Sequence, residues 1–230
     1  MFCKTKILLF LELLLIAIVV CALPDPSSAQ KKHSIVIDPA HGGEDLGVKV
    51  TDKIGEKDIT LAVALAFQKE LNKEGNFEVF LTRNADAIIT LKERRNSIAK
   101  IKPDVFLSLH INGGFGKNAA GFELYYPGFK DSADSKKKAK DGSAAIRNKY
   151  LNDSFRLAQI IQKNLDTLFP RKGRGLREAQ TPILEEINAP ALVVEIGFGT
   201  NPEERKKLLS AKGQLEIAGN LAKSVKLFFR

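Results

Sequence analysis

The stretch IVIDPAHGGEDLG, residues 35–47, combines a strand pattern with a turn of small residues. Its first residues are β-branched and apolar, as in a buried strand, and the proline and glycines that follow end such a strand. His41 lies within that turn. Taken alone, a histidine at a strand end is either a ligand or a structural residue that hydrogen-bonds its neighbours, so the rest of the chain has to decide between the two.

Strand and helix patterns alternate through the next part of the chain. The first strand is followed by a helical stripe over 59–71, a strand at 77–82 (FEVFLT), a helix over about 90–101 and a strand at 104–111 (DVFLSLHI). This βαβαβ order favours parallel strands joined by helices. The residues that we expect to face inward on the two helices are Ile59, Ala62, Val63, Ala66, Phe67 and Leu71, and then Leu91, Ile98 and Ile101.

The second half of the chain continues the pattern after an interruption. Residues 128–153 are rich in Lys, Ser and Asp, and we interpret them as a polar insertion or loop rather than a linker, since too little chain follows for a second domain. The whole pattern predicts an α/β fold with an open, twisted, mostly parallel sheet and helices on both faces. The remaining expected elements are strands at 121–127, near 181–184 and at 189–198, a helix over 157–168, and two closing helices, the last over about 214–229.

The first residues have the pattern of an export signal. Two lysines precede the apolar run 7–23, and the Ser-Ser-Ala sequence at 27–29 resembles a signal-peptidase site. An uncleaved membrane anchor is the alternative, but Glu12 interrupts a run that is already shorter than the ~20 apolar residues of a spanning helix. We therefore expect residues 1–29 to be a signal peptide and residues 30–230 to form one exported domain, with no stable membrane span after cleavage.

The cysteine content limits the chemistry of that domain. Cys3 and Cys21 both lie in the leader, so the mature chain has no thiol. Disulfides, cysteine-based zinc sites and a cysteine nucleophile are excluded. A transition metal would need imidazole and carboxylate ligands, and only His33, His41 and His110 can supply imidazoles.

The formal net charge of +9 suits a polyanionic environment such as a cell envelope. Nucleic acid is the competing partner, but the chain has no Trp and only three Tyr for base stacking, and its lysines are scattered. The densest basic run, KKKAK at 136–140, is flanked by Asp and Ser and has the composition of a solvated loop. We therefore expect no nucleic-acid partner.

Three polar side chains fall at the ends of predicted strands, where open α/β sheets bind ligands. His41 follows the first strand, His110 ends DVFLSLH, and Glu195 ends ALVVE. A carboxylate after four apolar strand residues is costly to bury unless it is paired or bound to a cation. Two histidines and a carboxylate that converge on one edge make a joint functional site more plausible than three separate structural residues.

Without thiols, such a site suggests zinc held by two histidines and one carboxylate, with a separate acidic base. The candidate carboxylates are Glu44, Glu56, Asp58 and Glu195. Glu56 lies where the first helix begins, so its side chain can reach the crevice, although for Glu56 alone a solvated first-turn glutamate is the favoured interpretation. Asp58 is better placed to cap that helix. The positions of these acids in the sequence do not show which carboxylate would be the zinc ligand.

Five segments together resemble a known family. In this order and spacing, the chain from about residue 34 to its end is similar to the zinc-dependent N-acetylmuramoyl-L-alanine amidases, which split bacterial peptidoglycan. Ala40, where a Gly is frequent, departs from the commoner pattern and indicates that this position does not need a positive φ. The segments are IVIDPAHGGEDLG at 35–47, GEKDITLAVALA at 55–66, FLTR at 80–83 with LKERRNSIAK at 91–100, FLSLHING at 106–113 and PALVVEIGFGTNPEE at 190–204.

The resemblance implies a role for each candidate. His41, Glu56 and His110 would be the zinc ligands, and Glu195 the catalytic base. The substrate would be peptidoglycan, cut at the amide between N-acetylmuramic acid and L-alanine of the stem peptide in wall turnover or daughter-cell separation. Asp38 either orients His41 or forms the turn before the proline, and Asn112 is a candidate for crevice contacts.

Two other functions remain open: a zinc peptidase acting on the stem peptide, and a wall-binding module without catalysis. The order His41, Glu56, His110 lacks the H-E-x-x-H helix of many zinc peptidases. In some relatives a helix near the position of 128–153 covers the zinc until an activator protein moves it. Here that segment lacks an apolar stripe, so we expect no tight self-inhibition, keep an activator as a candidate partner, and expect a monomer.

Overall fold

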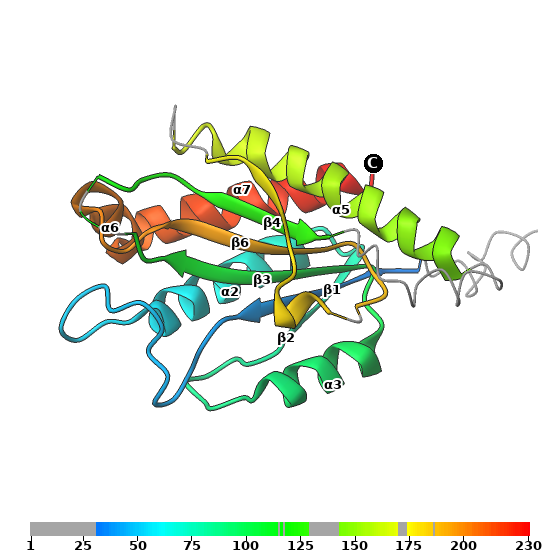
Figure 1. Ribbon diagram of the computed structural model, residues 1–230, viewed down its shortest axis with the longest axis horizontal. Coiled ribbons are helices and arrows are strands. Elements are labelled where there is room, and N and C mark those ends of the chain that lie inside the picture. Colours follow the sequence, from blue (N-terminus) through cyan, green and yellow to red (C-terminus); the bar gives the residue numbers. More distant parts are fainter. Residues whose placement is uncertain (1–30, 115, 117, 129–142, 170–173, 186) are drawn as a thin grey trace, which may run out of the picture. The chain divides into compact units, whose positions relative to one another are not determined.

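The computed structural model describes residues 31–114, 116, 118–128, 143–169, 174–185 and 187–230 (Figure 1). The chain separates into two units, and all the helices and strands described below lie in the second, residues 32–230. The predicted signal peptide, 1–29, lies outside the described residues. None of the helices in the described ranges is long and apolar enough to span a bilayer.

The sheet has six strands in the order β2-β1-β3-β6-β4-β5. β1 pairs in parallel with β2 and β3, β3 in parallel with β6, and β4 in parallel with β5, whereas β4 and β6 are antiparallel. The mostly parallel α/β sheet predicted from the sequence is therefore confirmed. The strands are β1 (His33–Pro39), β2 (Phe77–Leu81), β3 (Val105–Asn112), β4 (Glu123–Pro127), β5 (Leu176–Ala179) and β6 (Ala191–Phe198).

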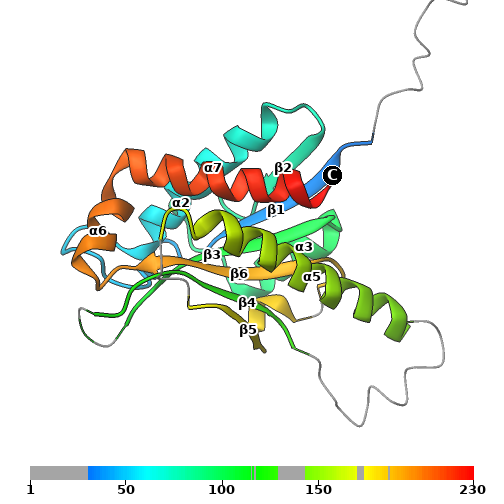
Figure 2. The same ribbon diagram turned by 90° about the horizontal axis from the view of Figure 1, so that it is seen from above.

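Helices cover both faces of this sheet (Figure 2). On one face α2 (Glu56–Asn72) and α5 (Ser143–Leu165) both pack against α7 (Ala211–Phe228), and on the other lies α3 (Leu91–Ile101). A short helix, α6 (Pro202–Leu209), links β6 to α7. The layers follow from the two-residue period of the strands, which sends alternate side chains to opposite faces.

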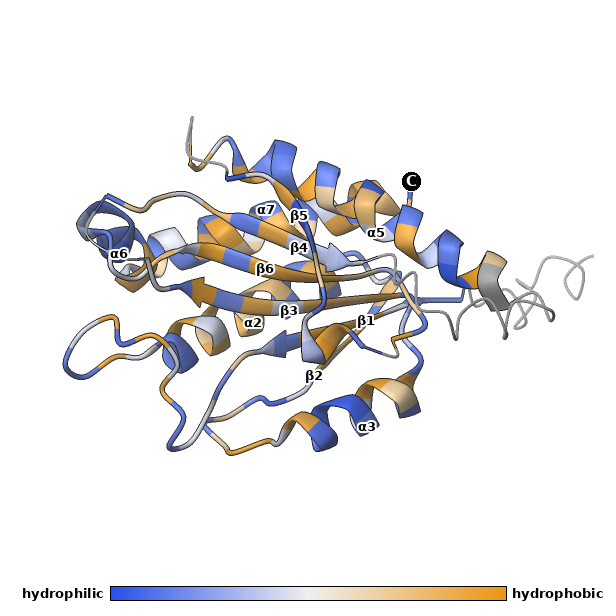
Figure 3. Cartoon of the chain, in the orientation of Figure 1, coloured by the Kyte–Doolittle hydropathy of each residue, from blue (hydrophilic) through white to orange (hydrophobic). Residues whose placement is uncertain are grey.

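The core is divided between these two faces. Ile35 and Ile37 of β1 belong to the large cluster under α2, α5 and α7, whereas Val36 belongs to the smaller cluster that contains Ile98 of α3. Figure 3 shows β3 and β6 as hydrophobic along most of their length, as expected of strands covered on both sides. Each large apolar side chain that is fully buried contributes roughly 1.5–3 kcal/mol, so the central strands are anchored firmly.

Three local predictions were wrong. The short strand expected near 181–184 is a 3₁₀ helix, η1 (Pro182–Leu184), and the strand is β5, a few residues earlier. Pro182 lacks the N–H that a ladder needs, while residues 176–179 meet the free edge of β4. Leu91, expected to face inward, is 42% exposed. The predicted insertion 128–153 ends sooner than expected, because α5 begins at Ser143, and residues 129–142 lie outside the described ranges.

The remaining feature that matters for function is the carboxyl edge of the sheet. β1, β3 and β6 are adjacent and parallel, so their last residues meet at one edge. In the register His110 lies opposite Glu195, and Glu195 lies opposite Glu123 of the antiparallel neighbour β4. Side chains paired in this way point to the same face of the sheet, and they form a row across three strands.

Candidate metal centre

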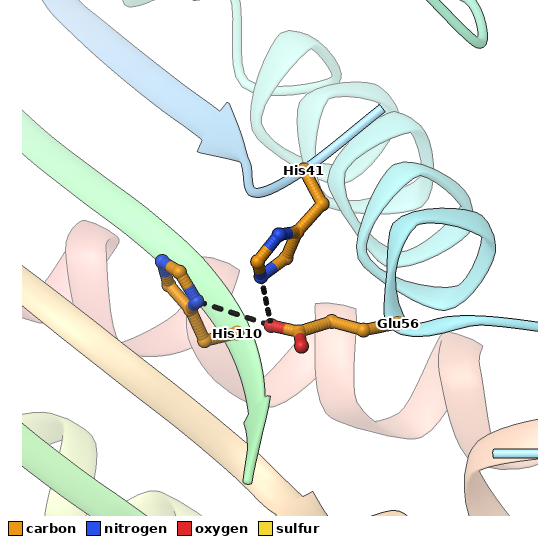
Figure 4. Close-up of side chains that lie close together, drawn as sticks. All are labelled: His41, Glu56 and His110. Carbon is orange, nitrogen blue, oxygen red and sulfur yellow. Dashed lines mark ion pairs between the residues drawn. The ribbon is translucent and has the colours of Figure 1, made fainter. Parts of the chain in front are cut away.

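His41, Glu56 and His110 come together from three different elements (Figure 4). His41 follows β1, Glu56 is the first residue of α2, and His110 lies near the end of β3. The Oε1 atom of Glu56 is 3.2 Å from Nε2 of His41 and 3.0 Å from Nδ1 of His110. One ligand atom from each residue lies within 4.8 Å of the others, so the three side chains can hold a metal ion.

Glu56 is only 2% exposed, and both of its oxygens have fixed partners. Oε1 accepts a hydrogen bond from the backbone N–H of Ile111, and Oε2 accepts one from the N–H of Val48, each at 2.9 Å. Burial by itself raises the pKa of this carboxyl group, but hydrogen bonds from His110 and His41 outweigh it and lower the pKa to about 2. The residue is therefore a preorganised anion that faces two imidazoles.

His41 is oriented from both sides of its ring. Its Nδ1 lies 2.7 Å from Oδ2 of Asp45, which leaves Nε2 directed at Glu56. The hydrogen bond with Glu56, and a smaller one with Asp45, raise the pKa of His41 to about 9 although burial opposes the shift. The raised pKa favours the protonated imidazole, so a positive charge is favoured beside Glu56, where a metal cation would bind.

Two arginines hold the turn that carries His41, whose φ of 62° is unusual for a residue with a side chain. Nε of Arg83 donates to the carbonyl of Pro39 and its Nη2 to that of Ala40, both at 2.9 Å. Nη2 of Arg94 donates to the carbonyl of His41 at 2.7 Å. The left-handed residue is His41 itself and not Ala40, which agrees with the alanine found there.

Asp38 supports the same turn indirectly. It is 2% exposed and forms a 2.5 Å ion pair with Nη1 of Arg94, and it accepts a hydrogen bond from Ser108 at 2.7 Å. No contact with the ring of His41 is recorded for the described residues. The proposal that Asp38 orients this imidazole is replaced by a different arrangement, in which Asp38 fixes Arg94 and Asp45 contacts the ring.

Gly47 makes room for two of the ligands. Its φ is +62°, and a Cβ atom built on it would lie 2.5 Å from Oε2 of Glu56 and 2.6 Å from Cδ2 of His41. Both the backbone conformation and the contact distance require glycine. The small residues of the opening stretch are therefore part of the site and not only of the turn.

Glu195 lies beside the three residues, in register with His110. Burial is the main reason why its pKa is raised to about 7, with the negative charges of Glu56 and Glu123 adding to the effect. Among the described residues its Oε2 atom has no hydrogen-bond partner. A buried carboxyl oxygen without a partner, next to a candidate metal site, is suited to binding and deprotonating a water molecule.

The donor set fits a divalent cation. In a tetrahedral zinc site with bonds of about 2.0–2.2 Å, neighbouring ligand atoms lie about 3.3–3.6 Å apart. The two oxygen–nitrogen separations here, 3.2 and 3.0 Å, are only slightly shorter. The side chains of His41 and His110 remain 24% and 27% exposed, which leaves an open side for water or substrate.

Other candidates lie outside the triad. Glu44 is exposed on the loop after His41. Asp58 is not the N-cap residue, which is Gly55; it caps α2 from the third helical position, accepting a hydrogen bond from Gly55 N–H at 2.9 Å. Asn112 donates to Glu123 at 2.7 Å. Sequence reasoning missed Asp45, although its position four residues after His41 was a usable signal.

A separate cavity of about 730 Å³ lies at the opposite, amino-terminal edge of the sheet. Its lining includes Pro103 and Asp104, which precede β3, and Pro190, which precedes β6. Neither the three candidate ligands nor Glu195 belongs to that lining. The chemistry is therefore placed at the carboxyl edge, where open α/β sheets bind ligands.

The fold and the site together point to a class of protein, hydrolases built on an α/β sheet whose edge carries a His, Glu and His group that could hold a metal ion. The profile of one family of this class, described as N-acetylmuramoyl-L-alanine amidase, matches residues 35–226. The chain belongs to that family.

Individual relatives agree with this assignment. The chain is 28% identical to N-acetylmuramoyl-L-alanine amidase AmiC of Escherichia coli O6:H1, over 90% of this chain and 55% of that protein. The crystal structure of N-acetylmuramoyl-L-alanine amidase from Clostridium difficile 630 superposes with a TM-score of 0.71 at 30% identity, covering 86% of this chain and 97% of that one. The CwlD amidase from Clostridioides difficile, solved in complex with the GerS lipoprotein, gives 0.70 at 26% identity, covering 86% and 98%. The chain spans about half the length of AmiC.

Proposed function

We propose that this protein is a zinc-dependent hydrolase that cleaves the amide bond between N-acetylmuramic acid and L-alanine of the peptidoglycan stem peptide. The observation that carries the proposal is the convergence of His41, Glu56 and His110 beside Glu195, whose Oε2 atom has no hydrogen-bond partner among the described residues. Membership of the amidase family supplies the substrate class.

In this proposal His41, Glu56 and His110 hold the zinc ion. Bound zinc would supply a Lewis acid that polarises the scissile carbonyl and makes a nearby water more acidic. Asp45 keeps the Nδ1 side of His41 occupied, so that Nε2 stays available as a ligand. The backbone N–H groups of Ile111 and Val48 keep the carboxylate of Glu56 in place.

Glu195 is the catalytic base in this mechanism. It accepts a proton from the attacking water as the oxygen bonds to the lactyl carbonyl carbon, and it then passes that proton to the nitrogen of L-alanine as the C–N bond breaks. The products are a muramic acid carboxylate and a stem peptide with a free amino terminus. A pKa raised to about 7 by burial suits a group that has to take up and release a proton near neutrality.

We propose further that the protein acts outside the cytoplasm, in the cell envelope. Two relatives are named cell wall amidases, and residues 1–29 have the pattern of a cleavable signal peptide. A protein partner is also proposed, because the related CwlD amidase forms a complex with a lipoprotein. An amidase domain over residues 30–230 that acts as a monomer is the simplest arrangement consistent with these features.

Mass spectrometry of purified peptidoglycan digested with the protein tests the proposal. Free stem peptides that begin with L-alanine are expected, and they should be absent after treatment with a chelator or in Glu195→Gln. Glu44→Gln is the matched control, because it removes an exposed acid from the same side of the molecule. Shortened stems still attached to muramic acid would identify a peptidase instead, and wall binding without products would identify a non-catalytic module.

A further inference from the structure

The row of side chains at the carboxyl edge does not end at Glu195. Glu123 of β4 lies opposite Glu195 in the antiparallel register and is only 4% exposed. Its Oε2 atom accepts hydrogen bonds from Nδ2 of Asn112 and from the hydroxyl of Tyr125, each at 2.7 Å. The role proposed above for the metal triad and Glu195 does not use this acid.

Two arginines converge on the other oxygen of Glu123. Nε of Arg174 lies 2.9 Å and Nη2 of Arg177 lies 3.5 Å from Oε1. Among the described residues, these are the ion pairs recorded for both guanidinium groups. One buried negative charge therefore faces two positive charges, and the cluster has an excess of one positive charge.

The arginines are exposed although their partner is buried. The side chains of Arg174 and Arg177 are 42% and 51% exposed, against 6% for that of Glu123. The guanidinium carbon of Arg174 lies 5.3 Å from the centre of the ring of Phe198, at the end of β6, which further restrains the group. Two restrained and exposed guanidinium groups, for which Glu123 is the ion-pair partner recorded within the described ranges, are suited to binding an anion.

The position of the pair relative to the metal triad indicates which anion. His110, Glu195 and Glu123 lie on three successive strands, and strands are spaced by about 4.8 Å, so Glu123 lies roughly 10 Å from His110 along the sheet. An extended peptide covers about 3.3–3.6 Å per residue. A group on the second residue beyond the scissile amide would therefore reach the arginines while that amide lies at the metal triad.

We propose that Arg174 and Arg177 form a subsite for a free carboxylate on the residue that follows L-alanine in the stem peptide. This inference rests on the proposed amidase function. The two guanidiniums would bind the carboxylate with charge-assisted hydrogen bonds, and buried Glu123 would hold them in position. The subsite would place the leaving peptide and would favour stems in which this carboxyl group is free over stems in which it is an amide.

A matched pair of substrates tests the proposal. Both are N-acetylmuramoyl-L-alanyl-D-glutamate with the side-chain carboxyl capped as its methylamide, and they differ only in whether the α-carboxyl group is free or is a carboxamide. We expect the full-length protein to cleave the free acid with a kcat/KM about 10- to 100-fold higher, the range for a hydrogen bond to a charged group. In Arg177→Gln the ratio should fall toward one, because the kcat/KM for the free acid falls.

Two further variants separate recognition from folding. Arg177→Lys keeps the charge and should retain part of the preference, whereas Arg147→Gln removes an exposed arginine of α5 and should leave the ratio unchanged. An equal kcat/KM for the two substrates in the unsubstituted protein would overturn the subsite and leave the amidase function intact. A preference that Arg177→Gln retains would also overturn it.

Isothermal titration calorimetry tests the subsite by measuring binding, without any catalytic step. The probes are the two corresponding product peptides, L-alanyl-D-glutamate derivatives with a free or amidated α-carboxyl group, titrated into the full-length protein. We expect tighter binding of the free acid, lost in Arg177→Gln. If neither substrate were cleaved, the proposed function would fail, while this titration would still decide whether the arginines bind a carboxylate; equal binding of both peptides would refute the subsite.

Discussion

Replacement of Glu195 by glutamine should make the metal-free protein more stable at alkaline pH and should change its stability much less at acidic pH. The reason lies in the burial of Glu195, whose Oε2 atom has no hydrogen-bond partner among the described residues. Burial raises the pKa of this carboxyl group to about 7. Above that pH the folded protein carries an ionised carboxylate in a poorly solvated place, and glutamine removes this charge without removing the side chain.

The magnitude follows from the two pKa values. Burial moves the pKa from 4.5 in the unfolded chain to about 7 in the folded protein. Between these values the folded state binds more protons than the unfolded state, so the free energy of unfolding falls as the pH rises. At about 1.4 kcal/mol per pKa unit, the total loss is about 3 kcal/mol. The loss begins near pH 4.5 and is complete slightly above pH 7.

Urea denaturation of both proteins in the presence of a chelator, at half-unit steps from pH 4.5 to 8.5, measures this effect. The informative quantity is the difference in the free energy of unfolding between Glu195→Gln and the unsubstituted protein, because titrations shared by both proteins largely cancel. That difference should grow by about 3 kcal/mol across the range. A difference that stays constant, or that shrinks with pH, would refute the argument from burial.

Three further substitutions test the support of the triad. Gly47→Ala should weaken zinc binding at least 10-fold, because the added Cβ atom would lie 2.5 Å from Oε2 of Glu56. Competition with a chromogenic chelator measures the zinc affinity, and an unchanged affinity would contradict the steric argument. Asp45→Asn should weaken zinc binding about 10- to 100-fold by weakening the restraint on the ring of His41, with the same assay as the check. Arg94→Met should destabilise the fold by about 3–5 kcal/mol in urea, because it leaves a buried carboxylate unpaired; a loss below 1 kcal/mol would show that the pair is dispensable.

The sheet could be predicted from the sequence because its strands have continuous apolar runs. β1, β3 and β6 all lie where the patterns placed them. The carboxyl ends of parallel neighbours meet at one edge, so His41, His110 and Glu195 could be brought together from strand order alone. A strand that forms only by pairing with a neighbouring strand was harder to predict. β5 has only four residues, and it pairs with the free edge of β4.

The ligand role of Glu56 could not be derived from spacing. A glutamate in the first turn of a helix is usually solvated, and only the path of the loop before α2 brings Glu56 under Val48 and Ile111. The same holds for the arginines, since nothing in FLTR or LKERRNSIAK shows that Arg83 and Arg94 bind the carbonyls of the first turn. Contacts between a side chain and a distant backbone leave no periodic signal in the sequence.

Three acids, Glu56, Glu195 and Glu123, lie close together at one edge of the sheet, and each has a different environment. Glu56 faces two imidazoles, so a cation or a proton must accompany it. Glu123 faces two arginines that exceed its charge. Glu195 lies between His110 and Glu123 in the register, no ion pair is recorded for it among the described residues, and its pKa is raised to about 7. An arginine placed beside Glu195 would lower the pKa of its carboxyl group and make Glu195 a weaker base. Because the arginines lie beside Glu123 and the imidazoles beside Glu56, the same edge of the sheet can bind a metal, exchange a proton at Glu195 and hold an anion.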